Sequence, residues 1–101
     1  MPDANASVSQ AAGHWQRAAL QPGLSPSERI QHIQQGLDAA ERALAIDPRA
    51  VDALAFKHLL LRLAASLETD AAARDALLRQ ADEARTRAVT LQNMRDAGFV
   101  E

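Results

Sequence analysis

The sequence is poor in residues that mark covalent or aromatic chemistry: it has no cysteine, no tyrosine, one tryptophan and two phenylalanines in 101 residues. Without cysteine there is no disulfide framework and no thiol chemistry, so the composition does not indicate a redox compartment. The net charge of -2 is too small to steer a partner and has the wrong sign for a polyanion, which argues against nucleic acid as a partner. No apolar run approaches the ~20 residues that a membrane-spanning helix needs.

The first residues, 1–5, also lack the basic and apolar regions of a secretory signal peptide. As written, the sequence therefore predicts a cytoplasmic protein, whereas a leader upstream of Met1 would make it periplasmic. Lys57 is the only lysine among 11 basic residues, and more than a fifth of the chain is alanine. This bias is typical of GC-rich bacterial sequences.

Alanine and leucine dominate while β-branched residues are scarce, which favours helix over sheet. Apolar residues recur at helical spacing in four segments. The segments predict helices at roughly 4–20, 26–46, 49–67 and 71–95. The predicted inward residues are Val8, Ala12, Trp15 and Ala19; Ile30, Ile33, Leu37, Ala40 and Leu44; Ala53, Phe56, Leu60, Leu63 and Leu67, with a second line of Val51, Leu54, His58, Leu61 and Ala65; and Leu77, Ala81, Ala84, Ala88 and Leu91.

The helix ends carry recognisable signals. Ser25 and Glu28 form a predicted capping box, with Pro26 at the first helical position. Pro22-Gly23 ends the first predicted helix, and Asp47-Pro48 ends the second. Asp70 is the predicted N-cap of the fourth helix and Gly98 its stop.

Sliding the sequence by 45 residues places apolar residues on apolar residues and arginine on arginine without a gap. Some matches in an alanine-rich chain arise by chance, but helix order and loop spacing also favour a true repeat of two units. The chain is then one domain, 1–101, of two antiparallel helix hairpins at about 4–46 and 49–95 with a tail at 96–101. The matched pairs include Gly36 with Ala81, Ala43 with Ala88, Arg42 with Arg87, Arg17 with Arg62, and Trp15 with Leu60.

The segment that ends the second helix resembles the tetratricopeptide repeat family. Gly36 stands at that family's small residue, Ala43 at its characteristic alanine, and Ile46-Asp47-Pro48 at its helix stop. The stretch from Ala53 to Arg62 is similar to one found in bacterial proteins with such a junction. The resemblance implies an all-α stack of hairpins, a TPR-like superhelical array, here with helices longer than in the usual ~34-residue unit.

In such stacks the first helix of each hairpin lines an inner groove, so the resemblance implies which residues meet a ligand. The implied groove is polar, with two arginines one repeat apart that suit carboxylates. A solvated face without a ligand is the competing interpretation. The candidate groove residues are His14, Arg17, Asp52, Leu59 and Arg62.

A second set of residues is expected to be structural. Gly36 costs about 1 kcal/mol in mid-helix relative to alanine, so close approach of another helix is the favoured reason for it, and sequence drift the other. Its repeat mate Ala81 suggests that Gly36→Ala would stabilise the fold. Trp15 is read as core, with a role as a partner-binding anchor as the alternative. The structural set is Trp15, Gly36, Ala43, Pro48 and Phe56.

Catalytic and metal chemistry find no support in the pattern. His14, His32 and His58 lack the spacing of a helical zinc or di-iron site, and His58 is expected to be a half-buried residue at a helix contact. No nucleophile elbow or phosphate-binding loop is present. The sequence therefore predicts no enzyme activity, no metal and no cofactor.

Two functional classes remain. The first is a non-catalytic module or scaffold that binds a peptide or partner protein in the helical groove. The second is a structural helical domain that pairs with a second copy as a homodimer, or forms part of a longer repeat array, because two hairpins fall short of the three repeats that such stacks usually need. Sequence alone does not identify the partner.

Overall fold

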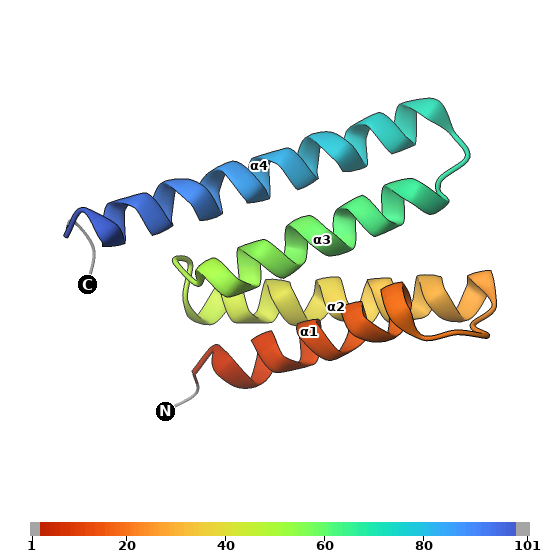
Figure 1. Cartoon of the computed structure of the whole chain (residues 1–101), viewed down its shortest axis with the longest axis horizontal. Helices are drawn as coiled ribbons and strands as arrows, with labels where there is room; N and C mark the ends of the chain where they lie inside the picture. Colours follow the sequence, from red (N-terminus) through yellow and green to blue (C-terminus); the bar gives the residue numbers. More distant parts are fainter. Residues whose placement is uncertain (1–2, 99–101) are drawn as a thin grey trace.

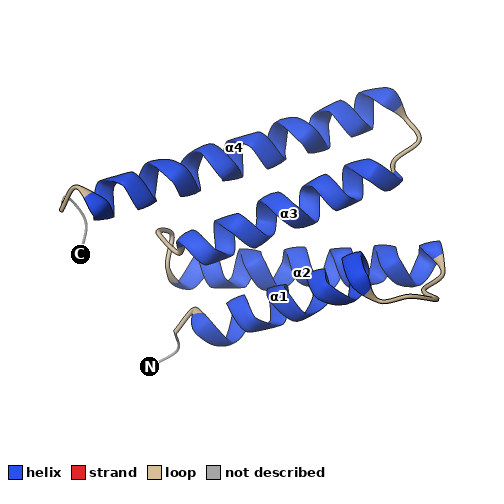
Figure 2. Ribbon diagram, in the orientation of Figure 1, coloured by secondary structure: helices blue, strands red, loops and turns tan. Residues whose placement is uncertain are grey.

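The computed structural model describes residues 3–98, and every regular element in that range is a helix (Figures 1 and 2). The helices are α1 (Asn5–Leu20), α2 (Pro26–Ile46), α3 (Val51–Leu67) and α4 (Ala71–Asp96). The all-α class and the four predicted segments are confirmed, with boundaries within two residues of those expected. The predicted tail residues Phe99 and Val100 lie outside the described residues.

Local chemistry sets the helix ends. The backbone N–H of Glu28 donates to Ser25 Oγ at 3.1 Å, and the N–H of Ser25 donates to Glu28 Oε1 at 3.1 Å, so the capping box is complete. At the start of α4 the N–H of Ala73 donates to Asp70 Oδ2 at 2.8 Å. Gly98 follows α4 with a φ of 83°, which glycine adopts without steric cost.

The four helices form two antiparallel hairpins, α1–α2 and α3–α4, and α3 is the central element. It packs against α1, α2 and α4, whereas α4 packs on α3 and diverges from α2 (Figure 1). The observed helix contacts are compatible with the predicted stacking of two hairpins. No described stretch of α2 lies directly beside α4, although Leu44 of α2 packs against the cluster that includes Ala88 and Leu91 of α4.

The core is built from small residues, so the helices approach closely. Leu60 is the largest fully buried side chain, and no polar side chain of the described range is buried. Three of the pairs given by the 45-residue offset are buried in both hairpins, whereas others differ, such as the buried Ile33 and its exposed mate Leu78. The buried pairs are Gly36 with Ala81, Ala39 with Ala84, and Ala43 with Ala88.

Gly36 lies at the tightest of these contacts. A Cβ built on it would lie 2.9 Å from both δ-methyl carbons of Leu60 and 3.2 Å from the Cβ of His14. These distances are shorter than ordinary van der Waals contact, so a glycine is required for α1 and α3 to approach α2 here. The close-approach explanation of Gly36 is confirmed.

The remaining structural residues occupy the junctions between hairpins. Phe56 of α3 packs against a buried cluster of Ala11, Ala39 and Ala40, and its ring centroid lies 6.3 Å from that of Trp15. Trp15 and Phe56 are half-buried rather than fully enclosed. Pro48 lies in the exposed turn between α2 and α3.

The predicted inward lines are correct for α4, and for α2 and α3 apart from the exposed Ile30 and Leu67, whereas the line of α1 is shifted. In α1 the buried residues are Ala11 and Ala18, one position before the predicted Ala12 and Ala19. Ile30, predicted to face inward, is 43% exposed because it lines an open hollow that α2 forms with Leu67 of α3 and Leu77 of α4. The half-buried ring of His58 confirms the prediction for that residue: its Nδ1 lies 3.0 Å from the carbonyl oxygen of Ala81.

Candidate functional site

The face predicted from the hairpin geometry is formed by α1 and α3. Arg17, Asp52 and Arg62 are exposed there, and Leu59 is half-buried. Asp52 also lines a small polar hollow of about 170 Å³ between the start of α1 and the α2–α3 turn. No hydrogen bond or ion pair within residues 3–98 joins the predicted groove residues to one another, so they form a polar surface rather than a preassembled site.

Among the predicted groove residues, the side chain of His14 contacts another side chain, that of His32. Its Nδ1 lies 3.2 Å from Nδ1 of His32 on α2, and both rings are half-buried. Burial, and then the charges of His32, Arg17 and Arg42, lower the pKa of His14 below its ordinary value. The His14 ring therefore contacts the neighbouring helix rather than being free to meet a ligand.

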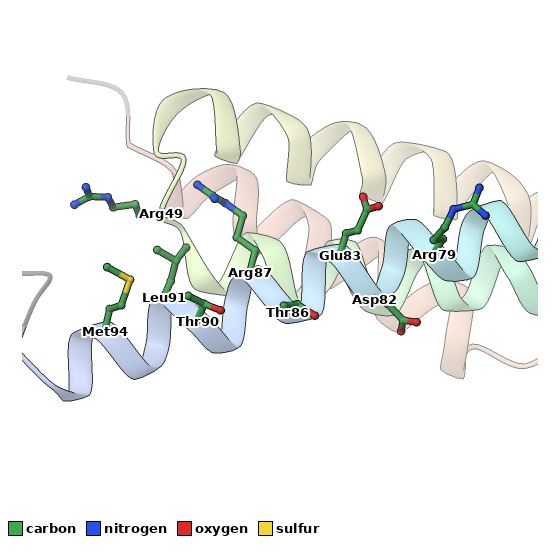
Figure 3. A pocket seen from close by; sticks show the side chains of 9 residues that line it. All are labelled: Arg49, Arg79, Asp82, Glu83, Thr86, Arg87, Thr90, Leu91 and Met94. Carbon is green, nitrogen blue, oxygen red and sulfur yellow. The ribbon is translucent and has the colours of Figure 1, made fainter.

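A wide, open groove lies on α4, where it passes the turn between α2 and α3. This surface, here called the α4 groove, has a volume of about 670 Å³. Figure 3 shows Arg87, Leu91 and Met94 pointing toward the side of α4 on which Arg49 lies. The lining residues are Arg49, Arg79, Asp82, Glu83, Thr86, Arg87, Thr90, Leu91 and Met94.

The α2–α3 turn is held against α4 by arginine donors. Nη2 of Arg87 donates to the carbonyl oxygen of Pro48 at 3.5 Å, and Nη2 of Arg95 donates to that of Arg49 at 3.0 Å. Each guanidinium keeps further N–H donors beyond the one used here. Within residues 3–98 the ion pair is that between Lys57 and Glu41. No carboxylate in that range therefore forms an ion pair with an arginine of the groove.

A second hollow is formed by the first half of α2, the end of α3 and the start of α4. It has a volume of about 260 Å³ and is mainly apolar. Ile30 and Leu67, which are 43% and 37% exposed, contribute to it. Its lining is Ile30, Ile33, Gln34, Leu37, Ala64, Leu67, Glu68 and Leu77.

The side chains of these surfaces supply hydrogen-bond donors and apolar contacts. Within residues 3–98 no group of three or more His, Cys, Asp or Glu side chains is placed to hold a metal ion. Every buried side-chain nitrogen and oxygen in that range has a hydrogen-bond partner. The α4 groove offers guanidinium donors beside an apolar strip, which suits a carboxylate-bearing peptide. No described helix combines the length and apolar character needed to cross a membrane.

Two of these features lie beyond the sequence-based prediction. The His14–His32 contact joins residues 18 apart on different helices, and no single-helix spacing reveals it. The α4 groove had a usable signal: Arg79, Glu83, Arg87, Leu91 and Arg95 follow one another at intervals of four on one line of α4. No known protein-family model, no curated protein and no solved structure matches the chain.

Proposed function

We propose that this protein is a non-catalytic interaction module that binds an acidic peptide segment of a partner protein in the α4 groove. The observation that carries the proposal is that Arg79, Arg87 and Arg49 line one groove along α4, with Leu91 and Met94 at the end of the groove near Arg49. The lining contains three arginines but only two carboxylates, Asp82 and Glu83, so its net charge is positive and favours an anionic ligand. The flexible Met94 side chain adapts to an apolar partner residue.

The architecture gives independent support. A tetratricopeptide-like stack, which remains part of the proposal, uses its long helical surfaces to hold peptides. Each exposed ionic contact contributes only about 0–1 kcal/mol. The expected affinity is therefore modest, depends on several contacts acting together, and falls as salt rises.

The α1–α3 face, with Arg17, Leu59 and Arg62, is the other proposed location for the same ligand class. Two double variants distinguish the faces, because each replaces two arginines of one face by glutamate. Arg49→Glu/Arg79→Glu alters the α4 groove without removing a recorded side-chain hydrogen bond, and Arg17→Glu/Arg62→Glu makes the same charge change on the other face.

The test begins with selection of peptides from a random displayed library against the immobilised chain. We expect enriched peptides rich in Asp and Glu with one or two bulky apolar residues. Binding of a labelled enriched peptide, followed by fluorescence anisotropy, should be lost in Arg49→Glu/Arg79→Glu and retained in Arg17→Glu/Arg62→Glu. The reverse result would move the site to the α1–α3 face. Enrichment of basic peptides, or of none, would reject the proposal.

Self-association is the second candidate. Leu78 and Val89 are 38% and 48% exposed, and they are the repeat mates of Ile33 and Leu44 in α2. The positions between them differ, because Asp82 and Arg85 stand where α2 has Leu37 and Ala40. A third hairpin, or a second copy stacked in the same manner, would cover these charges. This polar face favours the peptide-binding proposal over the homodimer and the longer array.

A further inference from the structure

Within residues 3–98, two side-chain hydrogen bonds join α1 and α2: one from Arg42 to Gln10, and one between His14 and His32. Nδ1 of one ring lies 3.2 Å from Nδ1 of the other, with the ring centroids 5.4 Å apart and the planes inclined by 35°. Both side chains are half-buried. At this distance one Nδ1 must carry a hydrogen and donate it, while the other accepts through its lone pair.

This arrangement limits how many protons the pair can bind. A neutral pair has one Nδ1–H donor and one acceptor. A first added proton can go to the Nε2 of the donor ring, and the Nδ1–H···Nδ1 bond survives. A second proton must occupy the accepting Nδ1, which leaves two N–H groups and two like charges facing each other.

The charged surroundings reinforce this limit. On α1 and α2, the positive charges of His32, Arg17 and Arg42 act on His14 together with burial, and all of these lower its pKa. Glu28, whose carboxylate accepts the N–H of Ser25, is a negative charge that acts on His32 and opposes this effect in part. The same two arginines oppose a metal cation, and two ring nitrogens without a third ligand do not make a metal site.

His14 of α1 and Leu60 of α3 are both packed closely against Gly36 of α2. The Cβ of His14 lies 3.2 Å from the position of a Cβ on Gly36, and Leu60 of α3 closes the same contact with its fully buried side chain. The residue that α3 brings here is apolar and offers no countercharge. The doubly charged rings can therefore separate only by rotating toward solvent or by moving α1 away from α2.

We propose that His14 and His32 form a proton-operated latch between α1 and α2, which holds with no proton or one added proton and opens when both rings are charged. This regulatory device is independent of the proposed peptide binding. The unfolded chain titrates such histidines near pH 6.5. Since the folded pair binds fewer protons than the unfolded chain, the stability that the latch gives is present above that pH and is lost as the pH falls below it.

The test uses substitutions that keep a hydrogen-bonding atom at the Nδ1 position. In His32→Asn the amide oxygen can accept from His14 Nδ1–H at any charge of His14, so the second proton no longer breaks the contact. His58→Asn is the matched control, because it makes the same change at the third histidine and its amide can donate to the Ala81 carbonyl as Nδ1 does now. Denaturant unfolding of the whole chain at pH 7.5, 6.5 and 5.5 gives the folding constant for each protein.

The latch predicts that the folding constant of the wild type and of His58→Asn falls between pH 7.5 and 5.5, and that His32→Asn shows less than half of that fall. An unchanged fall in His32→Asn, or a flat profile in the wild type, would overturn the proposal. If His32→Asn does not fold, nuclear magnetic resonance titration of the wild-type imidazoles decides. His14 and His32 must then titrate as a coupled pair in two separated steps, and independent single-step curves would refute the latch.

Discussion

The methyl groups of Leu60 reach within 2.9 Å of the place where a side chain at Gly36 would begin. Leu60 lies on α3, is fully buried and cannot move without disturbing the centre of the stack. The contact shows why a residue with poor helix propensity stands in the middle of α2. The helix loses about 1 kcal/mol relative to alanine, and the close packing of three helices compensates for it.

The first prediction concerns this contact. Gly36→Leu should lower the free energy of unfolding by roughly 1–3 kcal/mol or more, because its side chain has no space beside Leu60. Gly36→Ala gains helix propensity but must displace Leu60 and press on His14, so we expect a net loss of about 0–2 kcal/mol. Urea unfolding followed by circular dichroism measures both, with Gly13→Ala as a control that adds the same methyl to α1 in open space.

The expectation from sequence was that Gly36→Ala would stabilise the fold, by analogy with Ala81. The structure argues against this because the two positions have different neighbours. Gly36 meets Leu60 and His14, whereas Ala81 lies opposite His58, whose ring contacts its carbonyl oxygen. A clear gain in stability for Gly36→Ala would contradict the packing argument.

The second prediction uses the single tryptophan as a reporter of hairpin docking. Trp15 of α1 contacts Phe56 of α3 across the two hairpins. Phe56→Ala should cost about 1.5–2.5 kcal/mol, roughly half the loss for a fully buried phenylalanine, because Phe56 is half-buried. In the wild type, unfolding followed by Trp15 fluorescence should coincide with unfolding followed by circular dichroism. Separate transitions would show that the hairpins unfold independently.

The third prediction concerns the capping box of α2. The hydrogen bonds with Ser25 lower the pKa of Glu28 below its ordinary value of 4.5. The stabilising contribution of the carboxylate is therefore present above pH 4.5 and is lost as the pH falls through the lowered value. Wild type should be more stable than Glu28→Gln at pH 7, and the two should converge near pH 3. A difference that does not change with pH would mean that the charge of Glu28 is irrelevant.

The fourth prediction separates the two functional classes. The polar Asp82 and Arg85 on the outer line of α4 should keep the free protein largely monomeric, with at most weak pairing through Leu78 and Val89. Sedimentation equilibrium over a wide concentration range measures this directly. A tight dimer that Val89→Asp dissolves would instead favour the self-associating domain.

Most of the fold could be predicted from sequence because its signals are local. The capping box at Ser25, the Asp47-Pro48 stop and the Asp70 cap each act within four residues, and they set the helix ends. The 45-residue offset also matched Gly36 with Ala81, and both residues are buried. The exposure of Ile30 was missed because the hollow that it lines depends on how α2, α3 and α4 are placed relative to one another, which periodicity does not contain.

The candidate site was less accessible to sequence reasoning. The α4 groove depends on how the α2–α3 turn lies against α4, with Arg95 donating to the carbonyl oxygen of Arg49 across 46 positions of sequence. The His14–His32 contact likewise depends on the relative rotation of two helices. The predicted groove set placed His14 beside Arg17 correctly along α1, and its ring contact with α2 emerged only in three dimensions.

The central claim is that the α4 groove binds an acidic peptide, and chemical-shift mapping tests it most directly. The isotopically labelled chain is titrated with an enriched acidic peptide, with a peptide of the same sequence carrying lysine for each acid as control. We predict saturable shifts of backbone amides at Arg49 and along α4 from Arg79 to Met94, for the acidic peptide alone. Shifts confined to Arg17, Leu59 and Arg62, or equal responses to both peptides, would contradict the account.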